Sequence, residues 1–481
     1  MQKTPLEQFC HSILRKEFPL RKALVNLVMA VSASPDASSV TSLSLSNVYH
    51  YQYSSIGKSI SSISGDLPGF EKDLDDLLGE FFPSVSPSDF WLLNTDSSPL
   101  VRAHSKCLEN RRYVYSASHK VGRNRPVAIG YEFSTIGLSM ATTSWQSGSP
   151  PWNLPLNMSL VPFEENRNSF TAKQVNTLLD NDDFPLGQHL TVNTLDSNYA
   201  SPEYIADTYH QPNLVNIIRI SSNRNVWRSL KAEQVQANRS SNHDNRGADK
   251  VYGDKYKLNQ LLDWDLPYDE QSCFGIRLKN GKPCLVQIKT WEAMMIRTKR
   301  GKNMKDKPFR LYSIQLLDTQ TKVALFKKPL LLGIWGKREK ELSLEQIYWA
   351  YRARFDIEHF FRFGKQNLLL NSFQTPDENH QKAWLKVVQM AYWMLWLAQP
   401  QAQPKSKKWQ QYAYKNTAAY MSKIPSPSQV QQQMEIIIYL FDQEPFLPKL
   451  KIKGKGRKKG ELQKKRARHS VRKKPKKAKA A

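Results

Sequence analysis

The sequence predicts a mixed α/β fold, in which a sheet flanked by helices is interrupted by a β-rich insertion. Three observations predict it. Strand-like and helix-like segments alternate over residues 86–221. Short segments with strand composition then interrupt the polar, basic stretch 222–340, and a long helical pattern begins just after residue 341. A chain of 481 residues is long enough for a substantial core and for two or three domains.

The first 85 residues are expected to form helices joined by a Ser-rich connector. Within them, residues 23–37 imitate a signal peptide, because a short apolar run is followed by small residues. However, Glu7 and Glu17 precede this run, whereas a signal peptide begins with a positively charged segment. The region is therefore interpreted as the helical N-terminal part of a cytoplasmic protein.

Five segments of the following region have the composition of β-strands, and one has that of a helix. The segment HLTVNTLD, which ends at Asp196, is followed at once by a turn and a further helix. Such alternation is typical of a mixed sheet with helices on its faces. The predicted strands are 90–96, 126–140, 157–163, 189–196 and 214–221, and the predicted helix is 171–181, with Thr171 at its start.

Residues 222–340 are interpreted as a β-rich insertion and not as a continuation of the first sheet. The stretch begins with many Asn, Arg and Lys residues, which differ in character from the alternating segments before them. Strand composition returns only in three short pieces. These pieces are 282–291, 309–317 and 323–335.

A long helix is predicted to follow the insertion. Ser343 and Gln346 have the S-x-x-Q spacing of a capping box, in which each side chain bonds to the backbone N–H of the other residue. A second helical pattern covers 378–398, and its apolar run, 387–398, is too short to span a bilayer, so no membrane association is expected. The expected domains are 1–85, 86–221, 222–340, 341–400, a helical region at 401–448 and a disordered basic tail at 449–481.

The charge balance points to a polyanionic partner. The chain has 70 Lys and Arg residues against 43 Asp and Glu residues, a formal charge of +27. Residues 449–481 hold 17 of these cations and one Glu, so the remaining chain still carries +11. Nucleic acid is the first expectation and an anionic membrane surface the second. The alternative is that the tail merely adds solubility.

Two other sequence features are expected to carry no function. SSIGKS (54–59) resembles the end of a phosphate-binding loop but lacks the upstream glycine of that motif. The cysteines do not have the paired spacing of a zinc site and are expected to be reduced thiols. They are Cys10, Cys107, Cys273 and Cys284.

The segment YRARFDIEHFFRFGK (351–365) is predicted to be helical and to carry a polar stripe. At about 100° per residue, four polar residues share a face about 60° wide, and Ile357, Phe360 and Phe361 lie on the far side. An ordinary salt-bridged surface helix has the same pattern, since such pairs stabilise isolated helices by about 0.2–0.5 kcal/mol. Gly364 is expected to end or bend the helix. The four residues are Tyr351, Arg354, Glu358 and Lys365, and Arg362 lies beside them.

Two apolar strands are each predicted to end in an aspartate, Asp96 and Asp196. Carboxylates at the ends of neighbouring strands meet at one edge of a sheet, where Glu358 on a helix packed across that edge can complete a site for two divalent cations. Hard oxygen ligands favour Mg²⁺ or Mn²⁺, and paired metal ions suit phosphodiester chemistry. Four other acids do not end apolar strands and are given turn or surface roles: Asp182, Asp183, Asp263 and Asp265.

The order Y-x2-R-x3-E-x6-K, met by Tyr351, Arg354, Glu358 and Lys365, resembles the signature of bacterial insertion-sequence transposases of the DDE class. These form the insertion-sequence family four superfamily and have a ribonuclease-H-like catalytic core. NTDSSP around Asp96 and LDSNYAS around Asp196 resemble the first and second acidic motifs of that group. The β-rich stretch before Glu358 matches the usual insertion of the group. The resemblance covers roughly residues 85–400.

The resemblance implies a particular chemistry. Such an enzyme binds the terminal inverted repeats of its element, cleaves with water and then a 3′-hydroxyl as nucleophiles, and joins the ends to target DNA. By this resemblance Asp96, Asp196 and Glu358 coordinate two Mg²⁺ ions, for which Mn²⁺ can substitute. Tyr351, Arg354 and Lys365 contact DNA phosphates. The implied partners are double-stranded DNA and a second copy of the chain, in the bacterial cytoplasm near the nucleoid.

Two other functions stay open. One is a DNA-binding protein of the same descent that has lost catalysis, and the other is a metal-dependent nuclease without strand transfer. Some relatives hold a flipped base against aromatic residues of the insertion, but core packing is the expected role of Trp291 and Trp335. Recognition of the repeats is assigned to the N-terminal helices and the insertion. The basic tail is expected to bind phosphates without reading sequence.

Overall fold

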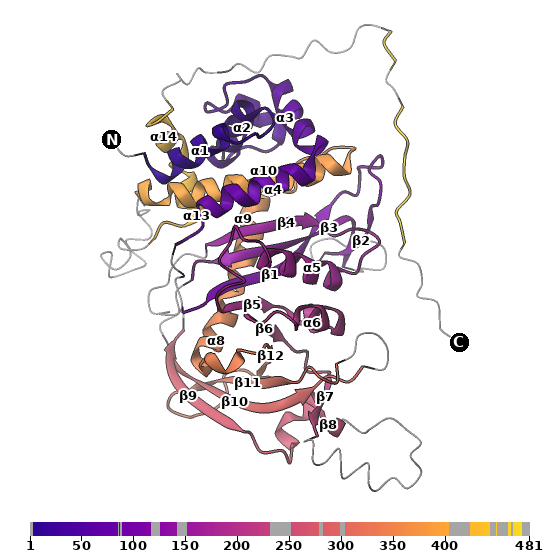
Figure 1. The fold of residues 1–481 in the computed structure, drawn as a ribbon, viewed down its shortest axis with the longest axis vertical. Coiled ribbons are helices and arrows are strands. Elements are labelled where there is room, and N and C mark those ends of the chain that lie inside the picture. The colour runs from indigo at the N-terminus through magenta and orange to yellow at the C-terminus, as the bar shows by residue number, and fades with distance from the viewer. Residues whose placement is uncertain are drawn as a thin grey trace. The chain divides into compact units, whose positions relative to one another are not determined.

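The protein, seen in a computed structural model, divides into two compact units that are described separately (Figure 1). Unit 1 comprises Met1–Val85, Asp96–Asn166 and Phe355–Ala481, and unit 2 comprises Ser86–Thr95 and Arg167–Arg354. The structure describes residues 3–84, 86, 89–116, 126–141, 152–230, 252–278, 282–298, 304–403, 424–442, 449, 460–462 and 465–473.

The N-terminal region of unit 1 is helical, as predicted. Thr4 and Glu7 form a capping box at the start of the first helix, with Pro5 at its first position, where its missing N–H is not needed. The signal-like run forms the second helix, which is almost wholly buried. The Ser-rich connector contains a short 3₁₀ helix. The elements are α1 (Pro5–Arg15), α2 (Arg21–Ala33), η1 (Val40–Leu45), α3 (Tyr53–Gly65) and α4 (Leu67–Glu80).

The core of unit 1 is built around α10 (Glu378–Ala398), whose bounds agree with the predicted helix. Asp377 caps it by accepting hydrogen bonds from Asn379 N and His380 N. From Ala383 to Ala398 every residue of the helix except Trp396 is buried, and the helix packs against α2, α3 and a strand of the same unit (Figure 1). A helix that is apolar all round is expected to lie inside a core. Within the described ranges, no helix is long and apolar enough to cross a membrane.

In unit 1, β3 pairs antiparallel with β2 and with β4. Arg102, just after β1, donates its N–H to Ile129 O of β3. The strand predicted at 157–163 begins earlier, at Asn153, and β2 was not predicted because its four residues lack an apolar run. The strands are β2 (Arg112–Tyr115), β3 (Val127–Ser139), β4 (Asn153–Leu160) and the part of β1 (Trp91–Val101) that begins at Asp96. β3 is the neighbour of β2, of β4 and of β1.

Unit 2 contains the parallel part of the sheet, which begins with the first residues of β1. β5 pairs in parallel with β1 on one side and with β6 on the other. These strands agree with the predicted ones, and so do the turn and helix after them, which are capped by Asp196 and Ser201. The elements are β5 (Thr191–Leu195), η3 (Ser197–Tyr199), α6 (Pro202–Thr208) and β6 (Leu214–Arg219).

One predicted helix begins earlier than expected. α5 spans Arg167–Leu179, so that Thr171 lies inside the helix and not at its start. Its side chain is fully buried, which explains why it packs in the core and does not cap the helix. α5 packs against α6 within unit 2.

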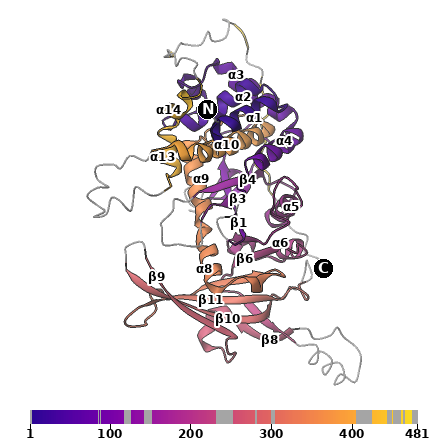
Figure 2. The same ribbon diagram turned by 60° about the vertical axis from the view of Figure 1, so that its left-hand side comes forward.

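The β-rich character of the insertion is confirmed, but its separation from the first sheet is wrong. The last strand of the insertion pairs antiparallel with β6, with Trp335 opposite Asn216, so the insertion extends the same sheet. The order continues from β6 through β12, β11 and β10 to β7 and β8, with β9 on β10. Figure 2 shows β9, β10 and β11 together in this part of the sheet. The strands are β7 (Asn225–Ser229), β8 (Tyr252–Lys257), β9 (Glu270–Arg277), β10 (Pro283–Met295), β11 (Phe309–Asp318) and β12 (Leu330–Trp335), and η4 is Leu258–Asp263.

The long helix predicted after the insertion is two helices, α8 (Leu344–Ala353) and α9 (Phe355–Asn367). The capping box is confirmed, since Ser343 Oγ accepts from Gln346 N at 3.1 Å and Gln346 Oε1 accepts from Ser343 N at 2.8 Å. The break falls at Arg354, whose N–H bonds back to Tyr351 O in a tightened final turn.

The bend expected at Gly364 is wrong, because α9 continues through this residue to Asn367. Gly364 is buried, and a Cβ at this position would come within 3.3 Å of Leu370 Cδ2. Its carbonyl accepts hydrogen bonds from the N–H groups of Leu368 and Leu370, which close the end of the helix. Close packing therefore offsets the cost of glycine in the helix interior. η5 (Glu339–Glu341) precedes α8.

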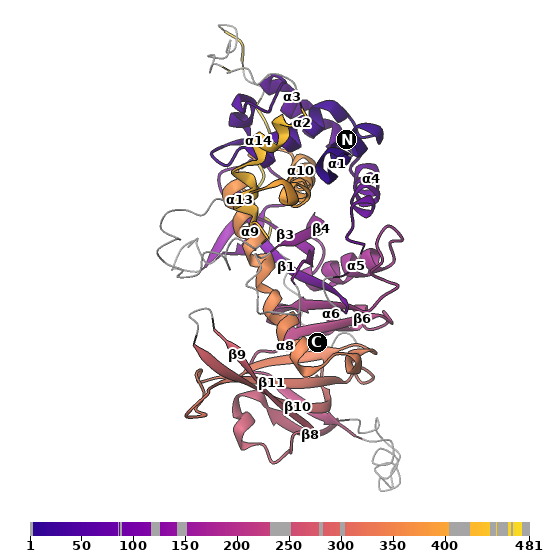
Figure 3. The same ribbon diagram turned by 90° about the vertical axis from the view of Figure 1, so that its left-hand side faces the viewer.

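The C-terminal region contains short helices that pack against α10 (Figure 3). They are η6 (Gln399–Gln401), α13 (Pro427–Gln431) and α14 (Met434–Tyr439). The disorder predicted for 449–481 concerns residues that lie mostly outside the described ranges. Within this tail the structure describes residues 449, 460–462 and 465–473.

Candidate active site

The prediction that Asp96 is the last residue of its strand is wrong, because β1 continues to Val101. The parallel pairing with β5 nevertheless ends at Thr95, opposite Leu195. Asp96 is therefore the first residue after the paired segment, and it is half-buried. Its Oδ1 accepts a hydrogen bond from Ser97 N at 2.8 Å.

Lys365 belongs to the same unit and lies near Asp96. Its Nζ donates to Ser98 Oγ at 2.6 Å, and Asp96 and Ser98 lie on the same face of β1 because they are two residues apart. Burial lowers the pKa of Lys365 below its ordinary value of 10.5, and the Asp96 charge offsets part of that shift. Glu358 lies two turns earlier on the same face of α9 and is exposed.

Asp196 directly follows β5 in unit 2, as predicted. It is the cap of η3, since its Oδ1 accepts from Asn198 N at 2.7 Å and its Oδ2 accepts from Asn198 Nδ2 at 3.0 Å. These bonds hold the carboxylate at the end of the strand.

Tyr351 lies within electrostatic reach of Asp196 in the same unit. Burial raises the pKa of the Tyr351 phenol, while Arg354 and Arg219 act in the opposite direction. The Arg354 guanidinium carbon lies 5.8 Å from the centre of the Tyr351 ring. Both side chains are nearly buried, so this pair is held in place by packing on α8 and by the turn that ends it.

Arg219 is a candidate that the sequence interpretation missed. The parallel register between β5 and β6 ends with Leu195 opposite Ile218, so Asp196 and Arg219 are the next residues on each strand. The Arg219 side chain is exposed, and its charge acts on Tyr351. The signal available in the sequence was a single cation near the end of the predicted apolar strand LVNIIRIS.

Buried Asn and Thr side chains set the register of β1 and β5 just before the two aspartates. Thr95 Oγ1 donates to Asn193 Oδ1 at 2.8 Å, and Thr194 Oγ1 donates to Asn94 Oδ1 at 2.6 Å. All four side chains are fully buried. A slip of one residue would break both bonds, so the pattern N-T specifies the pairing that precedes each acid.

The same network attaches the end of α8. Asn94 Nδ2 donates to Ala353 O at 2.9 Å, one residue before Arg354. Unit 2 thus holds the last turn of α8 and the paired part of β1 together through one side chain. The chain passes from unit 2 to unit 1 directly after each of them, at Thr95 and at Arg354.

We expect Thr194→Val to reduce the free energy of unfolding by about 1–3 kcal/mol, because it leaves the buried Asn94 Oδ1 without its donor while nearly keeping the side-chain volume. Urea denaturation of purified protein measures this change. Thr321→Val, in an exposed turn, is the control and should shift stability by less than about 0.5 kcal/mol. Equal stability of Thr194→Val and the unaltered protein would contradict the claim that these buried hydrogen bonds fix the register of β1 and β5.

A second prediction concerns the charge of Lys365. Because burial lowers its pKa, its positive charge should be lost at a lower pH than that of an ordinary lysine. If Lys365 binds a DNA phosphate, affinity should fall as the pH rises toward 10.5, and Lys365→Arg should remove this fall since arginine stays charged. Fluorescence anisotropy across the alkaline range measures it, with Lys382→Arg as the control. An identical pH profile for Lys365→Arg would contradict the assignment.

The three acids have the chemistry of a divalent-cation site. Carboxylate oxygens are hard ligands, which suit Mg²⁺ and Mn²⁺. Among the residues that the structure describes, however, no group of three His, Cys, Asp or Glu side chains is arranged to hold a metal ion. The structure brings Lys365 near Asp96 within unit 1 and Tyr351 near Asp196 within unit 2.

The residues given no catalytic role have structural ones. Trp335 is buried and stacks on Phe309 with ring centres 4.4 Å apart. Trp291 is buried and donates Nε1–H to Leu266 O at 3.2 Å, so both tryptophans pack in the core as predicted. The four cysteines are free thiols, of which Cys273 is exposed. The competing acids are all exposed: Asp182, Asp183, Asp263 and Asp265.

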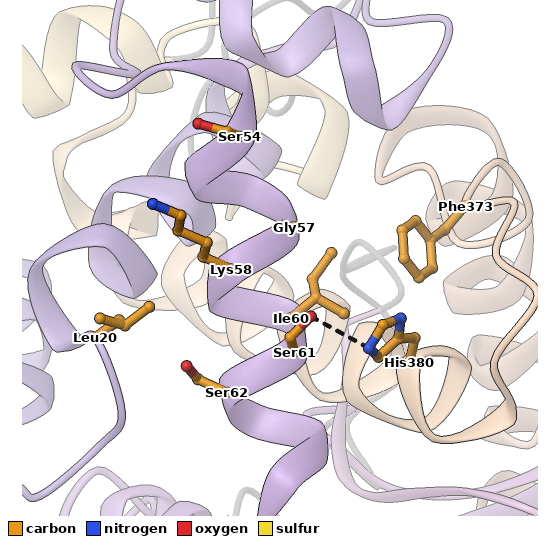
Figure 4. Close-up of a pocket in the computed structure, with 9 residues that line it drawn as sticks. All are labelled: Leu20, Ser54, Gly57, Lys58, Ile60, Ser61, Ser62, Phe373 and His380. Atoms are coloured by element: carbon orange, nitrogen blue, oxygen red, sulfur yellow. Dashed lines mark hydrogen bonds between the residues drawn. The ribbon is translucent and has the colours of Figure 1, made fainter. Parts of the chain in front are cut away.

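A cavity of about 610 Å³ lies in unit 1, among α3, the loop before α2 and the start of α10 (Figure 4). Ser61 Oγ lies 3.3 Å from His380 Nε2 beside it. The SSIGKS motif lies inside α3, whereas a phosphate-binding loop joins a strand to a helix. The motif is therefore not a phosphate-binding loop, as the sequence predicted. None of the six predicted site residues lines this cavity. Its lining is Leu20, Ser54, Gly57, Lys58, Ile60, Ser61, Ser62, Phe373 and His380.

Comparison with known families identifies the class. The family described as "Transposase DDE domain" matches residues 153–394, just over half of the 481-residue chain. The chain therefore belongs to the transposases with a DDE domain, enzymes of nuclease type that act on DNA. No curated protein matches the chain. The match includes Asp196, Glu358 and the three signature residues around it, whereas Asp96 precedes it.

Proposed function

We propose that this transposase binds the terminal inverted repeats of an insertion sequence, cleaves at the element ends and joins the 3′ ends to target DNA. The observation that carries the proposal is the position of two aspartates in the strand register. Asp96 and Asp196 each follow the last paired residue of neighbouring parallel strands. The family match, which includes Asp196 and Glu358, supports the same reaction class.

Asp96, Asp196 and Glu358 are proposed to hold two divalent ions, Mg²⁺ or Mn²⁺. When bound, such ions activate the attacking oxygen and stabilise the leaving oxygen of a phosphodiester. The protein supplies the charged carboxylates. Asn198 donates two hydrogen bonds to Asp196, and Ser97 N donates one to Asp96, so both side chains are oriented before metal or DNA arrives.

The cations around the acids are proposed to bind DNA phosphates. Lys365 is held by Ser98 beside Asp96, and Arg354 is held against Tyr351. Arg219 extends this set from the end of β6, in register with Asp196. Charge-assisted hydrogen bonds from Arg and Lys to phosphate are short and strong, so they can hold the scissile bond against the carboxylates.

The charge of the chain supports double-stranded DNA as the partner. The +27 formal charge includes a strongly basic tail, so binding to DNA should weaken steeply with salt. A homodimer is proposed because two element ends must be cut and joined together. The proposed setting is the bacterial nucleoid.

A supercoiled plasmid that carries the matching element ends tests the proposal. Incubation with the 481-residue chain and Mg²⁺ should yield products in which the element ends are joined to new DNA. Nicked or linear products alone would overturn strand transfer and indicate a nuclease. Binding without cleavage would overturn catalysis and indicate an inactive derivative. Omission of Mg²⁺ should abolish all products.

A further inference from the structure

The strand β2 lies at one end of the strand order and has a backbone edge that β3 does not cover. Tyr113 and Tyr115 on this strand are exposed, while the buried Arg112 points inward. An edge strand presents unpaired N–H and C=O groups that can pair with another extended segment. The free edge of β2 can therefore accept an extended segment.

Residues 465–473 of the basic tail lie along this edge in extended form. His469 N donates to Lys106 O at 2.9 Å, and Arg472 N donates to Arg111 O at 2.8 Å. Arg472 also forms a parallel β-bridge with Arg112 of β2. The donors are three residues apart, and both acceptors belong to the loop and strand start of the same unit. Of residues 465–473, only Arg472 forms a bridge to β2 itself, and both hydrogen bonds go to residues just before the strand. Backbone pairing with a free edge is one way in which an extended segment docks on a sheet.

Side chains complete the contact. The buried Arg111 donates from Nη2 to His469 O at 2.9 Å. His469 Nε2 lies 3.5 Å from Glu109 Oε1, and Arg472 Nη1 lies 3.5 Å from Glu164 Oε1. The Arg472 guanidinium also lies 5.1 Å from the centre of the Phe163 ring. Two carboxylates thus flank the edge, and they complement a basic segment.

We propose that the edge of β2, with Glu109 and Glu164, is a docking surface for residues 465–473 of the same chain. The occupant is defined by the observed pairing and by its charge, because a basic extended segment meets two acidic side chains. Docking ties the basic tail to the unit that carries Asp96, Glu358 and Lys365. The basic tail is then held to unit 1 through residues 465–473, and we call it an anchored arm.

The docking edge leads by side-chain contacts to the strand of Asp96. Arg112, which pairs with Arg472, places Nη2 3.5 Å from Glu132 Oε2 on β3. Glu132 Oε1 accepts from Ser97 Oγ at 2.9 Å, and Ser97 N donates to Asp96 Oδ1. A segment that pairs with Arg112 therefore braces the part of the sheet that bears the first acid.

Anchoring also has a consequence for affinity. Two linked binding elements act at a high effective concentration, so an anchored arm and the catalytic unit should bind one DNA together more tightly than an unanchored pair. This consequence rests on the proposed function, because it needs DNA as the partner. The docking itself needs no DNA and can be measured without it.

Proline substitutions test the docking without changing the number of Lys and Arg residues. His469→Pro removes the N–H that bonds to Lys106 O, whereas Ser470→Pro alters a residue that makes neither backbone bond. The readout is amide hydrogen exchange at Arg472, whose N–H bonds to Arg111 O. Exchange at Arg472 should be roughly two- to tenfold faster in His469→Pro and unchanged in Ser470→Pro.

Four further outcomes decide the proposal. His469→Ala keeps the backbone donor, so faster exchange only with proline assigns the contact to the backbone pairing. Exchange at Arg472 that is as fast in the unaltered protein as in His469→Pro would overturn the docking. Protection that disappears on dilution of the protein would overturn docking within one chain and assign the edge to the tail of a second copy. In DNA binding, His469→Pro should weaken affinity, and equal affinity would overturn the anchored-arm role.

Discussion

Replacement of Asp196 by Asn should abolish DNA cleavage while leaving binding to the element ends intact. Asparagine keeps the size and the capping oxygen but removes the negative charge that a divalent ion requires. Metal stabilisation of the reacting phosphate is worth several kcal/mol, so cleavage should fall by about 10³-fold or more. Asp96→Asn and Glu358→Gln should behave in the same way. Gel assays of plasmid cleavage and of end binding measure the two effects separately.

Asp182→Asn is the matched control, because Asp182 is an exposed aspartate of the same unit that follows a helix and not a strand. It should cleave and join DNA like the unaltered protein. Near-normal strand transfer by Asp196→Asn would remove that residue from the active site. Loss of end binding together with cleavage would indicate misfolding, and circular dichroism of the variant would then show it.

Trp393→Ala should lower the free energy of unfolding by about 3–5 kcal/mol, because it removes a large side chain from a buried helix. Trp393 is fully buried in α10 and donates Nε1–H to Pro155 O of β4 at 2.9 Å. The substitution leaves a cavity between the helix and the sheet of unit 1. It also removes one of the two hydrogen bonds that Pro155 O accepts, the other coming from Gln389 Nε2. Urea denaturation measures the loss.

Trp396 lies one turn further along α10 and is only half-buried. Trp396→Ala should therefore cost clearly less than Trp393→Ala, although it also loses the contact of its ring with Trp152 at 5.2 Å. Equal costs for the two substitutions would contradict the packing of α10 at the centre of unit 1.

Local signals predicted individual elements well. The capping box at Ser343 and Gln346 is present, because its two hydrogen bonds depend only on residues three apart. The bounds of α10 agree with the prediction, since Asp377 caps it and its apolar run is long. Asp196 directly follows β5 for the same reason: an apolar strand and a polar turn are adjacent in sequence.

Pairings between distant residues could not be predicted in this way. β12 joins β6 across more than a hundred residues, and the polar stretch between them hid the continuity of the sheet. β9 has alternating half-exposed residues and no apolar run, so its composition did not distinguish it from a loop. The end of α8 at Arg354 likewise depends on tertiary contacts, among them the bond from Asn94 to Ala353 O.

The candidate site was predicted in part for the same physical reasons. The acids and the signature cations have local sequence patterns, whereas the supporting residues do not. The reciprocal bonds of Thr95 with Asn193 and of Thr194 with Asn94 require knowledge of the strand register. Arg219 became a candidate only when that register placed it beside the end of β5.

The central claim is that Asp96, Asp196 and Glu358 act on DNA as one metal site. Anomalous diffraction from crystals of the chain with its element ends and Mn²⁺ tests it most directly. We predict two manganese peaks about 3.5–4 Å apart at the scissile phosphate, with all three carboxylates as ligands. Manganese bound to other acids, or with any of the three carboxylates absent from the coordination shell, would contradict the claim.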